Sequence, residues 1–574
     1  MNRKIYTLLI TLILFGQMFI PANAQSSAHT LTDQLASYLK HYQGVVYAVI
    51  DNDQKIVGGM GYADKKNHIL AHPANTAFHI GSISKTFVAI AVLQQVEAGN
   101  LNLYTDIQEY LHDDGLQFQY PINLHQLLTH TAGFEDLISG IAVNDAHSVL
   151  TIKESLIRYQ PAQFIEPSKV ISYSNYGIAL AAYIVEKASG VPFDLYAKEN
   201  IFIPLEMNHT TFDQFQDSIF VSKAYNSDLL SAKEPILNLY PEGSVITTAN
   251  DMIKYMEWCL SDESLLLSSA SKELLFTSQY SGSEDFEGIS YTFNIHNYNN
   301  ELVIEKKGET AYFHSQLVLY PKQKAALFLS FNSPLPWPWI HSIQNIFTAK
   351  ILGQKQEIEK PKIASIDPSG IYHATRSNFS TVERFLSLLI PDRTVSITKT
   401  GNNDFKLNGR PMVLIGENLY DSVIGVVKVV KTNDKTILLT DSALSFIKVP
   451  KIFNPLWQWL AIISFICLIV YYFLNQIYMW LKGHLHPVTL ISSISSLVLL
   501  CGFVVTLFGG LNEYNLLDIH QTLAWISISC IGFALLLIVS RVKRKHMISS
   551  VLSILIVSSF TVVLVINNVI PAIK

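Results

Sequence analysis

The stretch Phe78-His79-Ile80-Gly81-Ser82-Ile83-Ser84-Lys85-Thr86-Phe87 decides how the rest of the chain is read. A run of apolar character reaches a glycine, then a serine and a lysine follow at a spacing of three, and residues 88–93 continue with helical character. Residues three apart lie on the same face of a helix. We therefore expect Ser82 to open a helix, with Lys85 one turn further along the same face.

A serine and a lysine in this arrangement can carry out nucleophilic chemistry. A buried lysine amine can take the proton of a neighbouring serine hydroxyl if desolvation and nearby charge lower the pKa of the amine. The helix N-terminus also directs unpaired backbone N–H groups toward an oxyanion. The alternative is an N-capping serine beside a solvated lysine. Because both residue types are common, the rest of the chain has to decide between the two readings.

The composition indicates a membrane portion. The 574 residues are 49% hydrophobic and only 15% charged, and the mean hydropathy is +0.25, which is too apolar for an ordinary soluble protein. The net charge of −5 gives no indication of nucleic acid as a partner. Of the four cysteines, only Cys259 lies outside the apolar C-terminal runs, so neither a disulfide framework nor a metal site is expected, and no cofactor is implied.

The N-terminus has the features of a secretory signal peptide over residues 1–24. Arg3 and Lys4 form a basic region, residues 5–20 are apolar, and Ala22-Asn23-Ala24 provides a small-residue cleavage site. The domain that follows is therefore expected to be exported.

Residues 25–352 alternate short β-like runs with amphipathic helices, which predicts an α/β (α+β) domain. We expect a strand over 44–51, a hairpin over 316–330, and helices over 88–98, 179–188 and 252–260, the last capped by Thr248. Residues 353–364 are charged and linker-like. Residues 365–450 contain mostly short β-like runs and predict a small β-rich domain.

Residues 456–571 predict four transmembrane helices. The apolar runs 456–481, 488–510, 523–540 and 548–570 are each about as long as a bilayer is thick. Lys482 follows the first run and basic residues 541–545 follow the third, which places both loops on the cytoplasmic side and the preceding domain outside. A lipid bilayer is therefore an expected partner.

Two further segments supply polar groups for an acyl-enzyme. Tyr173 and Asn175 are two apart, so in an extended segment both side chains point the same way. Lys306-Lys307-Gly308-Glu309 precedes a predicted hairpin and offers a cation followed by a glycine that permits close backbone approach. Taken alone, the first segment could be a core edge with a turn, and the second a solvated charged turn. His130 reads as a structural, hydrogen-bonding residue.

Together these segments resemble the penicillin-recognising serine hydrolases, which include class C β-lactamases, penicillin-binding proteins and related esterases and D-peptidases. The resemblance covers residues 31–332 and, within them, includes the further pieces 127–134, 203–207 and 247–252. It implies a β-lactamase/transpeptidase-like domain with an antiparallel sheet flanked by helices.

The resemblance also implies a role for each matching residue. Ser82 would be the acylated nucleophile, Lys85 its activator, and Tyr173 the group that passes protons to the leaving group. Binding of the substrate would fall to Asn175, Lys306, Gly308 and Glu309, with the backbone N–H groups of Ser82 and Glu309 forming the oxyanion hole. Lys307 and Glu309 depart from the small residues usual in the family, so Lys307 could take the place assigned to Lys306.

A hydrolase of this kind followed by membrane helices resembles the membrane-anchored D-peptidases that activate prodrug peptides, although three spans are usual there. The first hypothesis is an exported, membrane-anchored serine hydrolase acting on an amide next to a D-residue in a small peptide. A β-lactamase or an esterase of the same family is the alternative. A penicillin-binding sensor and an envelope scaffold are alternatives of another class.

Overall fold

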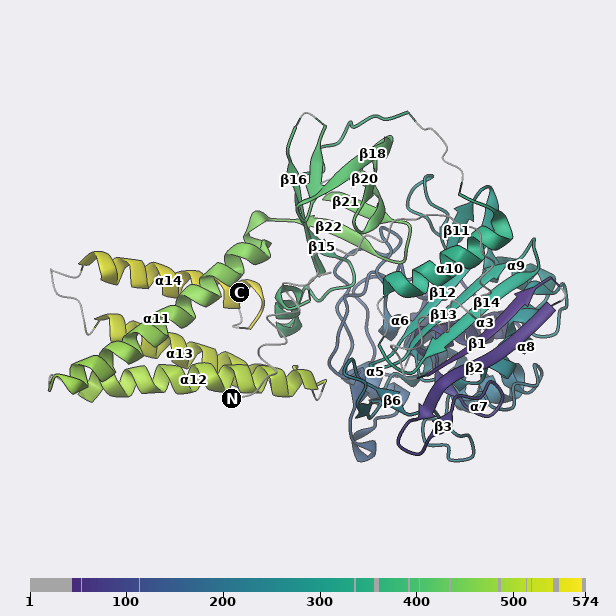
Figure 1. Cartoon of the computed structure of the whole chain (residues 1–574), viewed down its shortest axis with the longest axis horizontal. Helices are drawn as coiled ribbons and strands as arrows, with labels where there is room; N and C mark the ends of the chain where they lie inside the picture. The colour runs from purple at the N-terminus through teal and green to yellow at the C-terminus, as the bar shows by residue number, and fades with distance from the viewer. Residues whose placement is uncertain are drawn as a thin grey trace.

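The structure is a computed structural model that describes residues 44–569 except 53, 113, 335–336, 356–360, 391–392, 402, 433–434, 484–486, 513, 518 and 540–546. The chain forms a domain with a large sheet and helices, then a closed β-barrel, then a bundle of long apolar helices (Figure 1). The expected signal peptide lies outside the described residues, as does the basic segment 541–545.

The first domain is built on an eight-stranded antiparallel sheet. Its order places the N-terminal strand β1 between the last strand of the domain and β2, so the two ends of the domain meet in the middle of the sheet. The strands in order across the sheet are β10 (Gly288–Ile289), β11 (Asn294–Tyr298), β12 (Glu301–Glu309), β13 (His314–Tyr320), β14 (Ala325–Phe331), β1 (Gly44–Asp51), β2 (Gln54–Asp64) and β3 (Ile69–Leu70).

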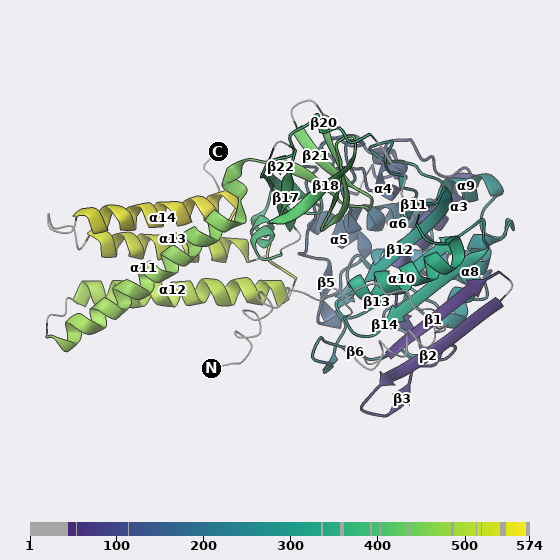
Figure 2. The same ribbon diagram turned by 45° about the horizontal axis from the view of Figure 1, so that its top comes forward.

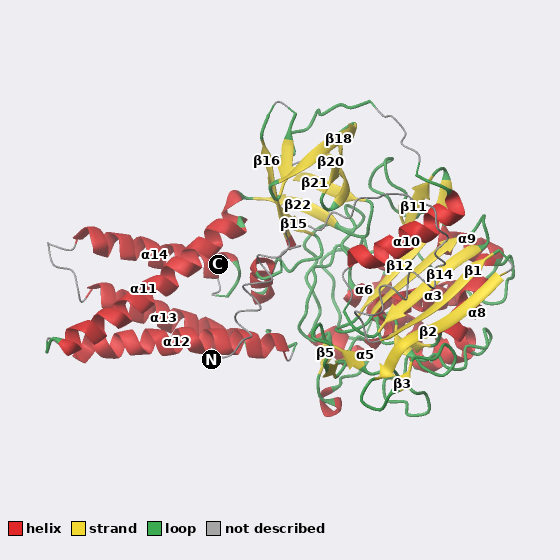
Figure 3. Cartoon of the chain, viewed as in Figure 1, coloured by secondary structure: helices red, strands yellow, loops and turns green. Residues whose placement is uncertain are grey.

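Helices cover both faces of this sheet, which explains why the central strands are apolar on both sides (Figure 3). On β1, Val46 and Ala48 face the core shared with α3 (Ser84–Glu97), α6 (Asn175–Ser189) and α8 (Ala249–Leu260). Val45 and Tyr47 face the smaller core under α10 (Trp337–Leu352). These elements confirm the predicted antiparallel sheet flanked by helices.

Side-chain caps begin two of the helices, and both helices start a few residues before the positions expected from the sequence, at Asn175 and Ala249; only the Thr248 cap was expected. The Thr248 hydroxyl accepts a hydrogen bond from the Asp251 N–H at 3.2 Å and begins α8, and Ser174 does the same for Gly177 at 3.0 Å in α6. The shorter elements are β4 (Phe78–His79), α4 (Leu124–Leu128), β5 (Ala142–Val143), α5 (Ile152–Arg158), α7 (Phe193–Ala197), β6 (Ala224–Tyr225), β7 (Ser231–Ala232), β8 (Ile236–Leu237), β9 (Ile246–Thr247) and α9 (Ser269–Phe276).

The predicted β-rich domain is a closed barrel, which leaves no free sheet edge. The barrel closes where β15 pairs with β22, with Ile371 opposite Val449. Its strands are β15 (Gly370–Ala374), β16 (Thr394–Lys399), β17 (Phe405–Leu407), β18 (Arg410–Gly416), β19 (Leu419–Ser422), β20 (Gly425–Thr432), β21 (Lys435–Thr440) and β22 (Ser445–Val449).

Four long helices follow: α11 (Pro455–Leu481), α12 (Pro487–Asn512), α13 (His520–Val539) and α14 (Met547–Ile566). Within the described residues, the stretches Pro455–Leu481, Leu490–Leu511 and His520–Val539 are long and apolar enough to cross a membrane. In α14 the corresponding apolar stretch is shorter, Ser553–Val565. Three apolar helices are thus found, and the fourth span stays a prediction.

The barrel lies between the sheet domain and the helical bundle and contacts both (Figure 2). The Thr375 hydroxyl donates to the carbonyl of Ile171 at 2.8 Å on the sheet-domain side. On the bundle side, the Trp459 indole donates to the Leu388 carbonyl at 3.1 Å. The α12–α13 loop also reaches the sheet domain, since the Leu517 N–H donates to Ser139 Oγ at 3.1 Å.

Candidate active site

Ser82 lies in a tight 3-10 turn, Gly81–Ile83, that runs directly into α3. The last residues of β12 press against this turn. A Cβ on Gly81 would lie 2.6 Å from the Glu309 backbone nitrogen, and a Cβ on Gly308 would lie 1.9 Å from the Ile80 carbonyl oxygen. Only glycine permits this approach at either position. The backbone of Glu309 is thereby brought beside the serine turn.

Lys85 is completely buried below Ser82 and its ammonium group donates three hydrogen bonds. The acceptors are Ser82 Oγ at 2.9 Å, the Glu242 carbonyl oxygen at 2.6 Å and the Glu242 carboxylate at 2.6 Å. Three acceptors match the three N–H donors of a charged ammonium group. Lys85 is therefore arranged as a cation that donates to the serine.

Tyr173 lies above the same pair, on the extended segment before α6. The Lys85 Nζ atom lies 5.3 Å from the centroid of its ring and the Lys306 Nζ atom 5.4 Å. Burial alone would raise the pKa of Tyr173, but the charges of Lys306, Lys85 and Arg376 and a hydrogen bond with Ser82 lower it below its ordinary value. The predicted trio of Ser82, Lys85 and Tyr173 thus comes together in one place.

His130 supports Tyr173 from the far side. The two rings lie 4.2 Å apart at an interplanar angle of 32°, and His130 Nδ1 accepts a hydrogen bond from the Ser174 N–H at 3.2 Å. Burial, together with the charges of Lys306, Lys85 and Arg376, holds the pKa of His130 well below its ordinary value, so the ring is neutral. The hydrogen-bonding role expected for this residue agrees with these contacts.

Lys306 enters the site and Lys307 does not, because side chains alternate across a strand. Lys306 is buried on the face shared with α3, where it donates to the Thr292 carbonyl. Desolvation, together with neighbouring charges, lowers its pKa to about 8. Lys307 lies on the α10 face, 3.1 Å from the Glu305 carboxylate. Of the two lysines, Lys306 is therefore the one whose side chain lies beside Tyr173.

Asn175 and Glu309 are the remaining predicted residues. Asn175 is the first residue of α6 and is nearly buried, and its Oδ1 atom has no hydrogen-bond partner among the described residues. The Glu309 side chain is 56% exposed and lies 3.4 Å from His314, so only its backbone approaches the serine turn. Within the described residues, no group of three His, Cys, Asp or Glu side chains could hold a metal.

Two residues of the site were missed by reading the sequence. Glu242, on the 3-10 turn Tyr240–Glu242, holds Lys85 across 157 residues. Arg376 follows the first barrel strand, and its Cζ atom lies 4.8 Å from the centroid of the Tyr173 ring. No local pattern marks either residue, because each acts through a contact that exists only after folding.

The sequence also matches a known protein family. A profile of the family described as Beta-lactamase matches residues 31–347, more than half of the chain. PbpX of Bacillus subtilis, provisionally named a penicillin-binding protein, is 29% identical over 280 residues, which cover 47% of this chain and 68% of PbpX. A beta-lactamase of Yersinia enterocolitica is 28% identical over 274 residues, covering 46% of this chain and 67% of that enzyme.

Solved structures show the same fold. The octameric penicillin-binding protein homologue from Pyrococcus abyssi aligns with a TM-score of 0.50 at 20% identity, covering 73% of this chain and 99% of its own. SurE with D-Leu aligns with a TM-score of 0.50 at 17% identity, covering 71% of this chain and 90% of its own. The match to residues 31–347, with this fold around them, shows that the chain belongs to the beta-lactamase family of serine hydrolases and penicillin-binding proteins.

Proposed function

We propose that this protein is an exported, membrane-anchored serine hydrolase that forms an acyl-enzyme on Ser82 and cleaves an amide next to a D-residue in a small peptide. The observation that carries the proposal is the single hydrogen-bonded cluster of Ser82, Lys85 and Tyr173. A hydroxyl, an ammonium group and a phenol of lowered pKa are the groups that acyl transfer needs.

In the first step, Ser82 Oγ attacks the substrate carbonyl carbon and loses its proton to the Tyr173 phenolate. Tyr173 is suited to accept this proton because Lys85 uses its three N–H donors on Ser82 and Glu242 and has no acceptor to offer. The charge of Lys85 then stabilises the serine oxygen as it becomes nucleophilic. The backbone N–H groups of Ser82 and Glu309 are the proposed donors to the oxyanion.

In the second step, the tetrahedral intermediate collapses. The C–N bond breaks, Tyr173 returns its proton to the leaving amine, and the acyl group stays on Ser82 as an ester. Water then attacks this ester, giving its proton to Tyr173, and releases the acid with Ser82 regenerated. Each proton taken up by Tyr173 is given back, so one cycle consumes one water and leaves the enzyme unchanged.

The assignment of a peptide substrate rests on the family and on Lys306. Its ammonium group is buried beside Tyr173 and is the proposed site for a substrate carbonyl or carboxylate. The Asn175 amide oxygen, which has no partner among the described residues, is the proposed acceptor for a substrate N–H. Curated relatives are named as penicillin-binding proteins and as a beta-lactamase. Hydrolysis of β-lactams is therefore the second candidate activity.

The membrane assignment rests on the three long apolar helices. We place the hydrolase domain on the outer side of the cytoplasmic membrane, because the first 24 residues have the features of a signal peptide and Lys482 follows α11.

Covalent labelling with a fluorescent penicillin tests the proposal. The full chain in detergent should be labelled, and Ser82→Ala should abolish both labelling and turnover. Turnover of N-acyl-D-amino-acid amides, short-chain esters and a chromogenic cephalosporin would then rank the candidate activities. Labelling that survives in Ser82→Ala would exclude the acyl-enzyme, and turnover of the cephalosporin alone would favour the β-lactamase.

A further inference from the structure

The barrel segment that follows β15 is held against the sheet domain by two carboxylates, one from each domain. Glu135 of the sheet domain accepts hydrogen bonds from the backbone of Phe379 at 2.6 Å and Ser380 at 2.9 Å. Glu383 of the barrel accepts from the backbone of Ile138 at 2.6 Å and Ser139 at 2.7 Å. Charged acceptors make these hydrogen bonds stronger than neutral ones. The segment that carries Arg376 therefore has a fixed position.

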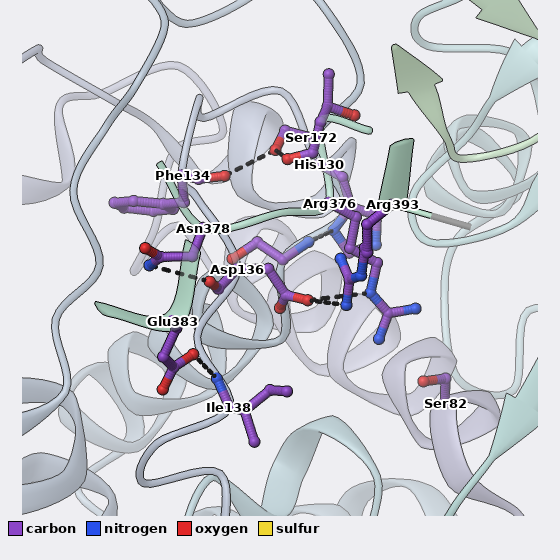
Figure 4. Close-up of polar contacts among 12 residues, drawn as sticks. Ser82, His130, Phe134, Asp136, Ile138, Ser172, Arg376, Asn378, Glu383 and Arg393 are labelled. Carbon is purple, nitrogen blue, oxygen red and sulfur yellow. Dashed lines mark hydrogen bonds and ion pairs between the residues drawn. The ribbon is translucent and has the colours of Figure 1, made fainter. Parts of the chain in front are cut away.

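Asp136 holds the arginine itself. Its carboxylate lies 3.5 Å from Arg376 Nε and 2.9 Å from Arg393 Nη2, so one acid from the sheet domain faces two arginines from the barrel (Figure 4). The Asp136 N–H also donates to the Ser377 carbonyl at 3.0 Å. The guanidinium group of Arg376 is thereby aimed at the ring of Tyr173, 4.8 Å away.

The charges around Tyr173 show what this arginine adds. Lys85 of α3 is balanced by the carboxylate of Glu242, and the pKa of Lys306 on β12 is already lowered to about 8. His130 is neutral. Arg376 stays protonated throughout the physiological range, and Asp136, Glu242 and Glu309 are the acids that act on it. Arg376 therefore adds to the charges of Lys306 and Lys85 a cation that keeps its charge where Lys306 loses its own, and its ion pair with Asp136, at 3.5 Å, is longer than the 2.6 Å pair of Lys85 with Glu242.

We propose that the barrel completes the active site: Arg376, held by Asp136, is a positioning residue that stabilises the anionic form of the Tyr173 phenol. The inference deepens the proposed function and rests on Tyr173 acting there as the base. It gives the barrel a direct part in the chemistry of the neighbouring domain. It also makes hydrolysis depend on docking of the two domains, since an undocked barrel would remove a positive charge from the phenolate.

A different use of the same side chain is an outcome of the test. The Arg376 side chain is 43% exposed, and its Nε atom, 3.5 Å from the Asp136 carboxylate, has no hydrogen-bond partner among the described residues. Its free donors could therefore bind an anionic group of the substrate. In that case Arg376 would change the affinity for charged substrates and leave the titration of Tyr173 unaltered.

The test is an NMR titration of the full chain in detergent, labelled with carbon-13 at Cζ of tyrosine and assigned with Tyr173→Phe. One charge at this distance shifts a neighbouring pKa by roughly 1–3 units, and partial exposure of Arg376 favours about one unit. We expect Arg376→Gln and Arg376→Met to raise the pKa of Tyr173 by about one unit, and Arg376→Lys to restore most of it. Arg410→Gln, which removes an exposed barrel charge, is the matched control and should have no effect.

The acid limb of the acylation rate against pH should move upward by the same amount in Arg376→Gln and Arg376→Met. An unshifted Tyr173 titration in both folded variants overturns the inference, as does an equal shift in Arg410→Gln. A selective rise in KM for substrates with a carboxylate, with the titration unchanged, assigns Arg376 to the substrate instead. Because the NMR titration needs no turnover, a parent protein that penicillin fails to label would refute the proposed function separately.

Discussion

The Lys85 ammonium group lies 2.6 Å from the Glu242 carboxylate, and both side chains are almost wholly buried. This pair holds the cation directly below the serine and was not visible in the sequence. Breaking a buried pair leaves a charge without a partner in a region of low dielectric, which is costly.

Glu242→Gln should therefore destabilise the protein. We expect the free energy of unfolding to fall by about 3 kcal/mol, measured by denaturant unfolding of the full chain in detergent. Glu257→Gln breaks the half-exposed pair with Lys55 and serves as the control, with an expected loss of less than about 1 kcal/mol. Equal effects of the two substitutions would show that burial of the Glu242 pair contributes nothing special.

Lys306 should give the enzyme a basic limb. Its pKa is lowered to about 8, so its charge is present below that pH and is lost as pH rises through it. If this charge binds substrate, kcat/KM falls above pH about 8 mainly through a rise in KM. Lys306→Arg should carry the activity to higher pH. Lys307→Gln, on the opposite face of β12, should leave the limb in place, and a limb that moved with Lys307 would contradict the assignment.

Gly308→Ala should separate β12 from the serine turn. The new Cβ would lie 1.9 Å from the Ile80 carbonyl oxygen, so the strand has to move. A displacement of about 1 Å near reacting groups costs roughly a hundredfold in rate. We expect a loss of that order in the rate of penicillin acylation. Gly532→Ala in α13, where a Cβ meets nothing within 4 Å, is the control. Normal acylation of Gly308→Ala would show that Glu309 does not take part.

Glu234 should make stability fall as pH rises. Burial raises its pKa to about 7, while hydrogen bonds from Thr310 and the Ala311 N–H oppose the shift. The folded state therefore binds a proton that the unfolded state has released, and stability declines from about pH 4.5 to about pH 7.

Thermal unfolding between pH 5 and pH 8 checks this linkage. Glu234→Gln should flatten the decline and unfold at a higher temperature than the parent at pH 8. Hydrogen bonds from Thr151 lower the pKa of Glu154, so this carboxyl group titrates below this pH range and its stabilising contribution is constant across it. Glu154→Gln should therefore leave the slope unchanged. A parent protein whose stability does not decline over this pH range would show that burial does not raise the pKa of Glu234.

The sequence alone predicted features that depend on neighbouring residues. The spacing of Ser82 and Lys85 predicted their contact at 2.9 Å, although Ser82 lies in the 3-10 turn Gly81–Ile83 and α3 begins at Ser84. The cap at Thr248 forms as expected. The hairpin over 316–330 is equally local. Hydropathy marked the apolar helices, because the bilayer selects for length and composition.

Other features could be decided only by the folded chain. Whether Lys306 or Lys307 enters the site depends on the pairing of β12 with β13, since a shift by one residue exchanges the two faces of a strand. Glu242 meets Lys85 across 157 residues, and Arg376 reaches Tyr173 from the barrel. The sequence determined which chemical groups the protein possesses and the local turns that carry them. The tertiary structure decided which charges surround them, because electrostatic interactions act through space between residues that no sequence pattern connects.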